Sequence, residues 1–217
     1  MYRYYFFDLD GTLTDPGIGI TNSVMYSLKK YNIEVAERSE LFRFIGPPLR
    51  DSYMNFYGFS EERAEEAVAF YREYFRDKGI FENEVYDGIP ELLSELKKCG
   101  ATIVLATSKP QEFAVRILDH FHLNQYFDYV SGASMDNSRN NKRDIIEAAI
   151  EALQISDRSE ILMVGDREHD VLGAKACGID AAGVLYGYGS REELVAAGAR
   201  YLAESPRDLP LPDRSLR

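Results

Sequence analysis

The stretch FFDLDGTLTD (residues 6–15) closes a short apolar run, Tyr4 to Phe7, with two aspartates and a glycine. The run predicts a buried β-strand, and the Asp-x-Asp-Gly that follows it predicts a turn. In open α/β sheets, ligands bind beyond the carboxyl ends of the strands. Asp8 and Asp10 therefore stand where such a sheet would carry a functional site, although a simple turn or helix cap also uses Asp and Gly.

Short apolar runs alternate with helical patterns along most of the chain. Strand-like runs cover residues 4–7, 101–106, 129–131, 161–164 and 181–185, and helix-like stretches cover residues 90–98, 112–121, 144–153 and 171–176. Continuous apolar strands separated by helices of about 10–15 residues are typical of a parallel sheet covered on both faces. We therefore predict an α/β, Rossmann-like sheet.

Residues 16–86 interrupt this alternation with a helical pattern and no clear strand. Of the 27 Phe and Tyr residues in the chain, 14 fall in this interval, and we expect most of them to pack a small core. The sequence therefore predicts a sheet domain over residues 1–15 and 87–217, with an inserted helical domain over 16–86. We expect residues 209–212 to form a loose tail.

Composition excludes several classes of protein. The net charge of −11 disfavours a nucleic-acid polymer or an anionic membrane surface as partner, because both attract clustered Lys and Arg. The two cysteines form no disulfide framework or zinc pattern. No stretch approaches the roughly 18 apolar residues of a membrane span, and the amino terminus does not resemble a signal peptide. We expect a soluble, cytoplasmic protein.

Polar groups also follow two other predicted strands. Thr107-Ser108-Lys109 ends the run at 101–106, and Gly165-Asp166 ends the run at 161–164. Asp166 and Asp170 are four residues apart, so a helix beginning there would place them on one face. Lys142 opens the helix between these strands. If the sheet is parallel, all of these groups meet at one edge.

Such a cluster suits phosphoryl transfer. Asp8, Asp166 and Asp170 would repel one another without a cation, and Mg²⁺ binds carboxylates together with substrate phosphate. Asp8 can act as a nucleophile that forms an acyl phosphate, and Asp10 can exchange the protons of the reaction. Donors and positive charge for phosphate oxygens would come from Thr107, Ser108 and Lys142.

The order and spacing of four motifs resemble the haloacid dehalogenase superfamily, in its phosphoglycolate phosphatase-like branch with a helical cap after the first strand. The motifs are FFDLDGTLTD (6–15), ATSK (106–109), Lys142 and GDREHD (165–170), and the resemblance covers essentially the whole chain. It implies that Asp8 is the nucleophile and Asp10 the acid/base. It also implies Mg²⁺ held by the Asp8 side chain, the Asp10 backbone carbonyl and Asp166, with Asp170 beside them, and phosphate bound by Thr107, Ser108 and Lys142.

The chain departs from the family pattern after Lys142, where Arg143 replaces the usual proline. We still assign the third motif to Lys142, because Asn140-Asn141-Lys142 opens a helix at the right distance before Asp166. Lys109 is the rival, and we expect it to lie nearby and add positive charge at the phosphate.

Arg50 follows Gly46-Pro47-Pro48, a stretch that looks like the cap's substrate-specificity loop in this branch. An arginine there could grip a carboxylate or a second phosphate in a bidentate manner. A surface arginine beside a rigid proline turn is an equally good interpretation.

The second acid, Asp10, points to phosphoryl chemistry, because the dehalogenases of the superfamily lack it. We predict a Mg²⁺-dependent phosphatase that hydrolyses a small phosphomonoester, of the 2-phosphoglycolate type, through an aspartyl-phosphate intermediate. The alternatives are a 5′-nucleotidase, because GDREHD and TSKP look like relatives of that type, or a broad-range phosphatase. A non-catalytic binding protein on the same fold is disfavoured, because Asp8, Asp10, Lys142 and Asp166 are all present.

Overall fold

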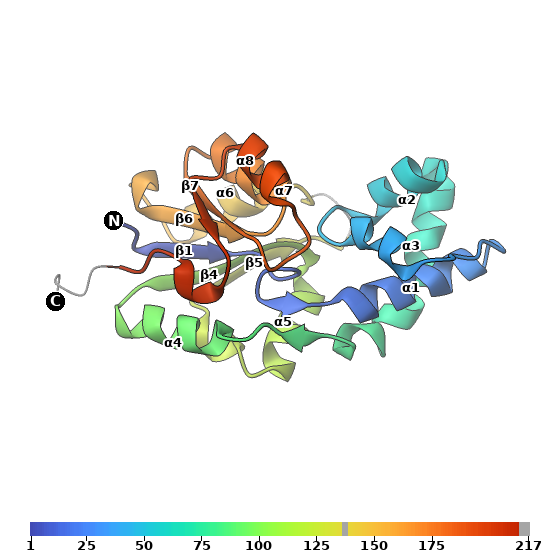
Figure 1. Ribbon diagram of the computed structural model, residues 1–217, viewed down its shortest axis with the longest axis horizontal. Coiled ribbons are helices and arrows are strands. Elements are labelled where there is room, and N and C mark those ends of the chain that lie inside the picture. Colours follow the sequence, from blue (N-terminus) through green and yellow to red (C-terminus); the bar gives the residue numbers. More distant parts are fainter. Residues whose placement is uncertain (136–138, 213–217) are drawn as a thin grey trace. The chain divides into compact units, whose positions relative to one another are not determined.

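The computed structural model describes residues 1–135 and 139–212, and the chain divides into two compact units (Figure 1). One unit comprises residues 1–14 and 85–217, and the other comprises residues 15–84. These limits lie close to those predicted for the sheet domain and the inserted domain. The two connections between the units, β2 (Thr14–Asp15) and β3 (Glu84–Val85), pair as a small sheet. The expectation that the inserted region holds no strand is therefore wrong at its carboxyl end.

The first unit is built on a six-stranded sheet in the order β5-β4-β1-β6-β7-β8. Its neighbouring strands all pair in parallel, which confirms the predicted α/β fold class. The central strand β1 pairs with both β4 and β6, and Phe7 lies opposite Leu105 on one side and Val164 on the other. The strands are β1 (Tyr4–Phe7), β4 (Thr102–Pro110), β5 (Tyr129–Ala133), β6 (Ile161–Gly165), β7 (Asp180–Val184) and β8 (Tyr201–Ala203).

Helices cover both faces of this sheet, which explains why its strands read as unbroken apolar runs. Figure 1 shows α6, α7 and α8 on one side of the sheet and α4 and α5 on the other. Phe6 and Met163 face the first group, where they pack with Ile145 and Leu194. The helices are α4 (Ile89–Lys98), α5 (Gln111–His120), α6 (Lys142–Ala152), α7 (Glu168–Ala176) and α8 (Arg191–Ala197). Within the described residues, no helix is both long enough and apolar enough to span a membrane.

The carboxyl-terminal part of this unit differs from the sequence-based expectation. The prediction missed α8 and the edge strand β8, whose three residues are too short to show a pattern. The expectation of a loose tail from residue 209 is also wrong for its first residues. Leu209 is buried, and the Tyr5 hydroxyl donates a hydrogen bond to the Pro210 carbonyl at 2.7 Å. Apolar burial and this bond attach the segment to the sheet unit.

The second unit consists of the helices α1 (Gly17–Lys29), α2 (Leu49–Tyr57) and α3 (Glu61–Phe75), with short 3₁₀ helices at Arg38–Phe44 and Gly79–Phe81. Gly58 ends α2 in a left-handed conformation, and the Ser60 hydroxyl caps α3. Aromatic rings pack against one another here: Tyr53 lies 5.1 Å from Phe44 and 5.9 Å from Phe59 between ring centroids. These aromatic residues therefore serve the core, as expected.

Candidate active site

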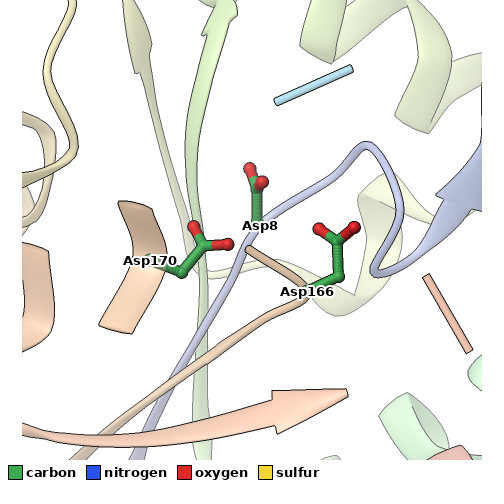
Figure 2. Close-up of side chains that lie close together, drawn as sticks. All are labelled: Asp8, Asp166 and Asp170. Atoms are coloured by element: carbon green, nitrogen blue, oxygen red, sulfur yellow. The ribbon is translucent and has the colours of Figure 1, made fainter. Parts of the chain in front are cut away.

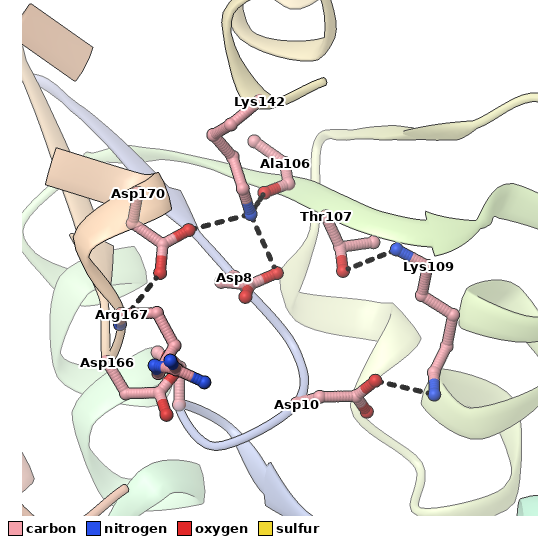
Figure 3. Close-up of polar contacts among 10 residues, drawn as sticks. Asp8, Asp10, Ala106, Thr107, Lys109, Lys142, Asp166, Arg167 and Asp170 are labelled. Carbon is pink, nitrogen blue, oxygen red and sulfur yellow. Dashed lines mark hydrogen bonds and ion pairs between the residues drawn. The ribbon is translucent and has the colours of Figure 1, made fainter. Parts of the chain in front are cut away.

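The carboxyl ends of three adjacent strands bring the predicted site residues to one edge of the sheet (Figure 3). Asp8 follows β1, Thr107 lies in the last part of β4, and Asp166 follows β6. The Asp8 backbone N–H donates to the Val164 carbonyl at 2.9 Å, so pairing between β1 and β6 continues to Asp8. The pairing of β1 with β6 therefore fixes the position of Asp8, at which the turn after β1 begins.

The turn after β1 is held by its own backbone. The Leu9 carbonyl accepts bonds from the N–H groups of residues 12–14, and the Gly11 N–H donates to the Thr14 carbonyl at 2.8 Å. Gly11 has φ +81°, and a Cβ there would lie 2.2 Å from Asp166 Oδ2. Only glycine fits both the backbone conformation and the space. The glycine of the Asp-x-Asp-Gly stretch therefore lets this turn contact the loop that follows β6.

The loop after β6 differs in one respect from the prediction. Helix α7 begins at Glu168, so Asp166 lies in the preceding turn and does not share a helix face with Asp170. Asp170 belongs to the first turn of α7, where its Oδ2 accepts a bond from the Arg167 backbone N–H at 3.2 Å. The helix therefore starts before the predicted stretch 171–176 but after Asp166, and both carboxylates still reach the same site.

Asp8, Asp166 and Asp170 form a buried carboxylate cluster (Figure 2). One oxygen from each lies within 4.8 Å of the others. Burial and the neighbouring Asp170 charge raise the pKa of Asp166 well above its ordinary value. Burial also raises the pKa of Asp170 to about 6, against the opposing effect of Lys142. The cluster is costly for the folded protein while its members are ionised, and a divalent cation would relieve that cost.

Lys142 is the cation of this cluster. Its Nζ lies 3.0 Å from Asp8 Oδ1 and 2.7 Å from Asp170 Oδ1, and it donates to the Ala106 carbonyl at 2.9 Å. Burial lowers the pKa of Lys142, but Asp170 and Asp8 outweigh that effect and raise the pKa overall. The Asn141 side chain accepts a bond from the Asp144 N–H at 2.9 Å, which caps α6 and places Lys142 at its start.

The three carboxylates of the cluster carry more negative charge than Lys142 can balance, and a metal ion could neutralise the excess. One ammonium group faces three buried carboxylates, and Lys142 is shared between the Oδ1 atoms of Asp8 and Asp170. The cluster keeps an excess of negative charge, and carboxylate oxygens are ligands that Mg²⁺ prefers. These residues therefore fit a magnesium ion, with Asp8, Asp166 and Asp170 as the side chains that could hold it.

Asp10 lies outside this cluster and contacts a different cation. Lys109 Nζ is 2.6 Å from Asp10 Oδ2, and both side chains are buried. Burial raises the pKa of Asp10, while Lys109 opposes the rise and Asp8 adds to it. A raised pKa suits a residue that must carry a proton to the reaction. Lys109 was expected to lie nearby and add positive charge at the phosphate, and its ammonium group pairs with Asp10, the proposed acid/base.

An irregularity in β4 explains the direction of Lys109. Thr107 pairs with Gly132 and Pro110 pairs with Ala133, the next residue of β5. Ser108 and Lys109 are therefore extra residues of β4 at this point in the register with β5. Such bulges often redirect side chains next to active sites. Thr107 Oγ1 accepts a bond from the Lys109 backbone N–H at 3.2 Å, which stabilises the bulge. Thr107 is buried and Ser108 is half-buried at the same edge.

Arg50 belongs to the other unit, at the start of α2. Its guanidinium group pairs with Glu61 Oε1 at 3.2 Å and with Glu65 Oε1 at 3.8 Å, both on α3. These partially exposed pairs hold α2 to α3. A substrate anion that uses Arg50 would have to compete with both glutamates.

Sequence reasoning missed two groups that hold the site together. Glu193 Oε1 accepts bonds from Arg167 Nε and from the Glu168 N–H, each at 2.8 Å, and so clamps the loop after β6. The Thr12 hydroxyl donates to Asp166 Oδ1 at 3.4 Å. Neither residue gives a local signal, because the partners lie 25 or more positions away along the chain.

The fold and this edge define a phosphoryl-transfer site: a nucleophile candidate, an acid/base candidate, a lysine and a metal-binding carboxylate cluster on a parallel sheet. Residues 5–184 match the family described as haloacid dehalogenase-like hydrolase. The chain belongs to this family, which confirms the resemblance seen in its motifs.

Two relatives and one solved structure show which members of the family this chain is similar to. A 5′-nucleotidase of Pseudomonas aeruginosa is 46% identical over 90% of this chain and 88% of its own length. Phosphoglycolate phosphatase 1 of the same species is 30% identical over 95% and 78%. A crystal structure of a predicted phosphatase from Clostridium acetobutylicum superposes with a TM-score of 0.92, at 51% identity and 94% coverage of both chains. The predicted enzyme class, a phosphoric monoester hydrolase, agrees with the family and with these names.

Proposed function

We propose that the protein is a Mg²⁺-dependent phosphatase that cleaves a small phosphomonoester through an aspartyl-phosphate on Asp8. The observation that carries this proposal is the placement of Asp8, which contacts Lys142 and shares a buried carboxylate cluster with Asp166 and Asp170. When bound, Mg²⁺ supplies charge neutralisation for the phosphoryl oxygens. Lys142 keeps the Asp8 carboxylate oriented and adds positive charge beside the transferring group.

The first half of the reaction uses Asp8 and Asp10. A carboxylate oxygen of Asp8 attacks phosphorus, and the bond from phosphorus to the substrate's ester oxygen breaks. Asp10, whose pKa is raised by burial, donates its proton to the leaving oxygen, so that an alcohol departs. The phosphoryl group is then covalently attached to Asp8.

The second half returns the enzyme to its starting state. Asp10, now ionised beside Lys109, accepts a proton from water while the water oxygen attacks phosphorus. The bond from phosphorus to Asp8 breaks and releases inorganic phosphate, with Asp8 again a carboxylate and Asp10 again protonated. The hydroxyl of Thr107 and the edge residue Ser108 are proposed to bind the phosphoryl oxygens in both halves.

Asp10→Asn tests this assignment through the leaving group. We expect kcat for an alkyl phosphate to fall by about 10²-fold, because general acid catalysis contributes at least that much when the leaving oxygen needs a proton. For p-nitrophenyl phosphate, whose leaving group needs no proton, the first step should be far less affected. Burst kinetics would separate the two halves. An equal loss of the first step for both substrates would contradict the role of Asp10 as acid.

The substrate is proposed from the comparisons and the position of Arg50. The relative named 5′-nucleotidase is more similar over most of its length than the one named phosphoglycolate phosphatase. Arg50, the expected anchor for a glycolate carboxylate, is already paired with Glu61 and Glu65. Both observations favour a nucleoside 5′-monophosphate over 2-phosphoglycolate.

A Mg²⁺ assay over nucleoside 5′-monophosphates, 2-phosphoglycolate and sugar phosphates tests this preference. We expect kcat/KM to be at least about tenfold higher for one or more nucleotides, a difference of about 1.4 kcal/mol in transition-state binding. The EDTA-treated enzyme, with and without added Mg²⁺, is the control for metal dependence. A higher value for 2-phosphoglycolate would overturn the nucleotide preference, and similar low values for all would indicate a broad-range phosphatase.

A further inference from the structure

The loop Leu185–Gly189, here called the glycine loop, connects β7 to α8 and supplies no group to the reaction described above. Its sequence, Leu-Tyr-Gly-Tyr-Gly, has no acidic or basic side chain. Four of its residues nevertheless lie against Asp166 or the turn that follows β1. These contacts, most of which involve the backbone, indicate that the glycine loop has a structural role at the site.

The first contact is a hydrogen bond to a carboxylate of the cluster. The Tyr188 backbone N–H donates to Asp166 Oδ2 at 2.8 Å. Asp166 is fully buried, so its carboxylate depends on protein groups for hydrogen bonds. A main-chain donor at this distance stabilises the carboxylate and fixes which way it points.

The second contact is steric. A Cβ at Gly187 would lie 2.2 Å from the Gly11 carbonyl oxygen and 2.4 Å from Asp166 Cβ. A Cβ at Gly189 would lie 1.9 Å from the Asp166 carbonyl oxygen. These neighbours are backbone atoms or a Cβ, so they cannot move aside as the tip of a flexible side chain can. The glycine loop thus touches both catalytic segments at distances that only glycine allows.

The third contact joins the glycine loop to the Asp-x-Asp-Gly turn. The Tyr186 hydroxyl donates to the Thr12 carbonyl at 3.1 Å, and the Tyr186 ring meets Tyr86 edge-on with centroids 5.0 Å apart. Thr12 in turn donates through its side chain to Asp166 Oδ1. Asp166 is therefore held on both oxygens by groups that the glycine loop donates or fixes.

We propose that the glycine loop is a positioning element for the magnesium site: its backbone fixes the Asp166 carboxylate in the orientation that lets the cluster bind the ion. This inference rests on the proposed function, which requires the ion. Groups that orient a metal ligand commonly change metal affinity by about 10–100-fold when they are altered. Gly187, Gly189 and the Tyr188 N–H then serve the metal site through Asp166 and Gly11.

Gly187→Ala tests the proposal by direct calorimetric titration with Mg²⁺, without any substrate. We expect the Kd for Mg²⁺ to rise by about 10–100-fold, because the added methyl group displaces Asp166 or the turn at Gly11. The matched control is Gly183→Ala on β7, where the three atoms nearest to a Cβ would all belong to Leu194, at 2.8, 3.0 and 3.1 Å. The control should bind Mg²⁺ like the wild type.

A milder variant keeps the test valid if Gly187→Ala does not fold. Tyr186→Phe retains the ring and removes only the hydroxyl bond to Thr12. We expect a smaller but measurable, several-fold weakening of Mg²⁺ binding, with circular dichroism unchanged. Unchanged affinity in a folded Gly187→Ala, or in Tyr186→Phe if the former is unfolded, would overturn the inference. Failure of the wild type to bind Mg²⁺ would instead overturn the proposed function.

Discussion

Asp8→Asn is expected to reduce kcat by about 10⁴-fold or more, because the amide cannot attack phosphorus from the position that Asp8 holds beside Lys142. The variant is nearly isosteric, so the sheet edge and its packing should persist. Turnover is measured at saturating Mg²⁺, because Asp8 also belongs to the carboxylate cluster. In the wild type, acid quenching during turnover should trap a phosphoryl group on the peptide that contains Asp8, and mass spectrometry of that peptide detects it.

The control for this prediction is Asp119→Asn, an exposed aspartate at the end of α5 that lies outside the site. It should retain wild-type kcat and thermal stability. Full Mg²⁺-dependent turnover by Asp8→Asn, or a trapped phosphoryl group on another residue, would contradict the proposed mechanism.

Lys142→Met has the second largest expected effect, because it alters both catalysis and folding. Removing the ammonium group leaves Asp8 and Asp170 as buried carboxylates without their shared partner. Breaking a buried ion pair in this way costs about 3–5 kcal/mol of unfolding free energy. The lost positive charge should also lower kcat by about 10²–10³-fold. Urea unfolding in EDTA and steady-state kinetics in Mg²⁺ measure the two effects separately.

The stability loss of Lys142→Met should grow as the pH rises. Asp170 has a folded-state pKa of about 6 even beside Lys142, above its ordinary value of 3.8, and the pKa must rise further without the lysine. A carboxyl group with a raised folded-state pKa binds more protons in the folded state, so stability falls as the pH increases toward that pKa. The variant should therefore be closer to wild type at pH 5 than at pH 8.

Lys142→Arg separates charge from geometry. The guanidinium group keeps the positive charge but cannot place one nitrogen between Asp8, Asp170 and the Ala106 carbonyl. We expect most of the stability to return and most of the loss in kcat to remain. If Lys142→Met were as stable as the wild type in EDTA across this pH range, Lys142 would not be the cation that balances the cluster.

The fold was largely predictable because its signals are local. The apolar runs at 4–7 and 161–164 are long enough to show burial on both faces, and they became the adjacent strands β1 and β6. The start of α6 could also be predicted from the sequence, because Asn141 caps the helix and the helical pattern follows directly. The three residues of β8 carry no such pattern, and their position at the edge of the sheet depends on pairing with β7.

The partners of the site lysines were not predictable. Lys109 and Lys142 both lie near phosphate-binding positions in the motifs, and motif order alone could not assign their contacts. The bulge between Thr107 and Pro110 redirects the chain, and it depends on the register with β5. Lys109 therefore meets Asp10, whereas Lys142 meets Asp8 and Asp170.

The sequence by itself determined the family, the parallel sheet and the set of acidic and basic residues at its carboxyl edge. It could do so because strand burial, helix capping and motif spacing are properties of neighbouring residues. Only the tertiary structure decided which cation balances which carboxylate, where α7 begins, and that the glycine loop holds Asp166. Those features depend on contacts between segments far apart in the chain, where distances of 2–3 Å are set by packing and strand register.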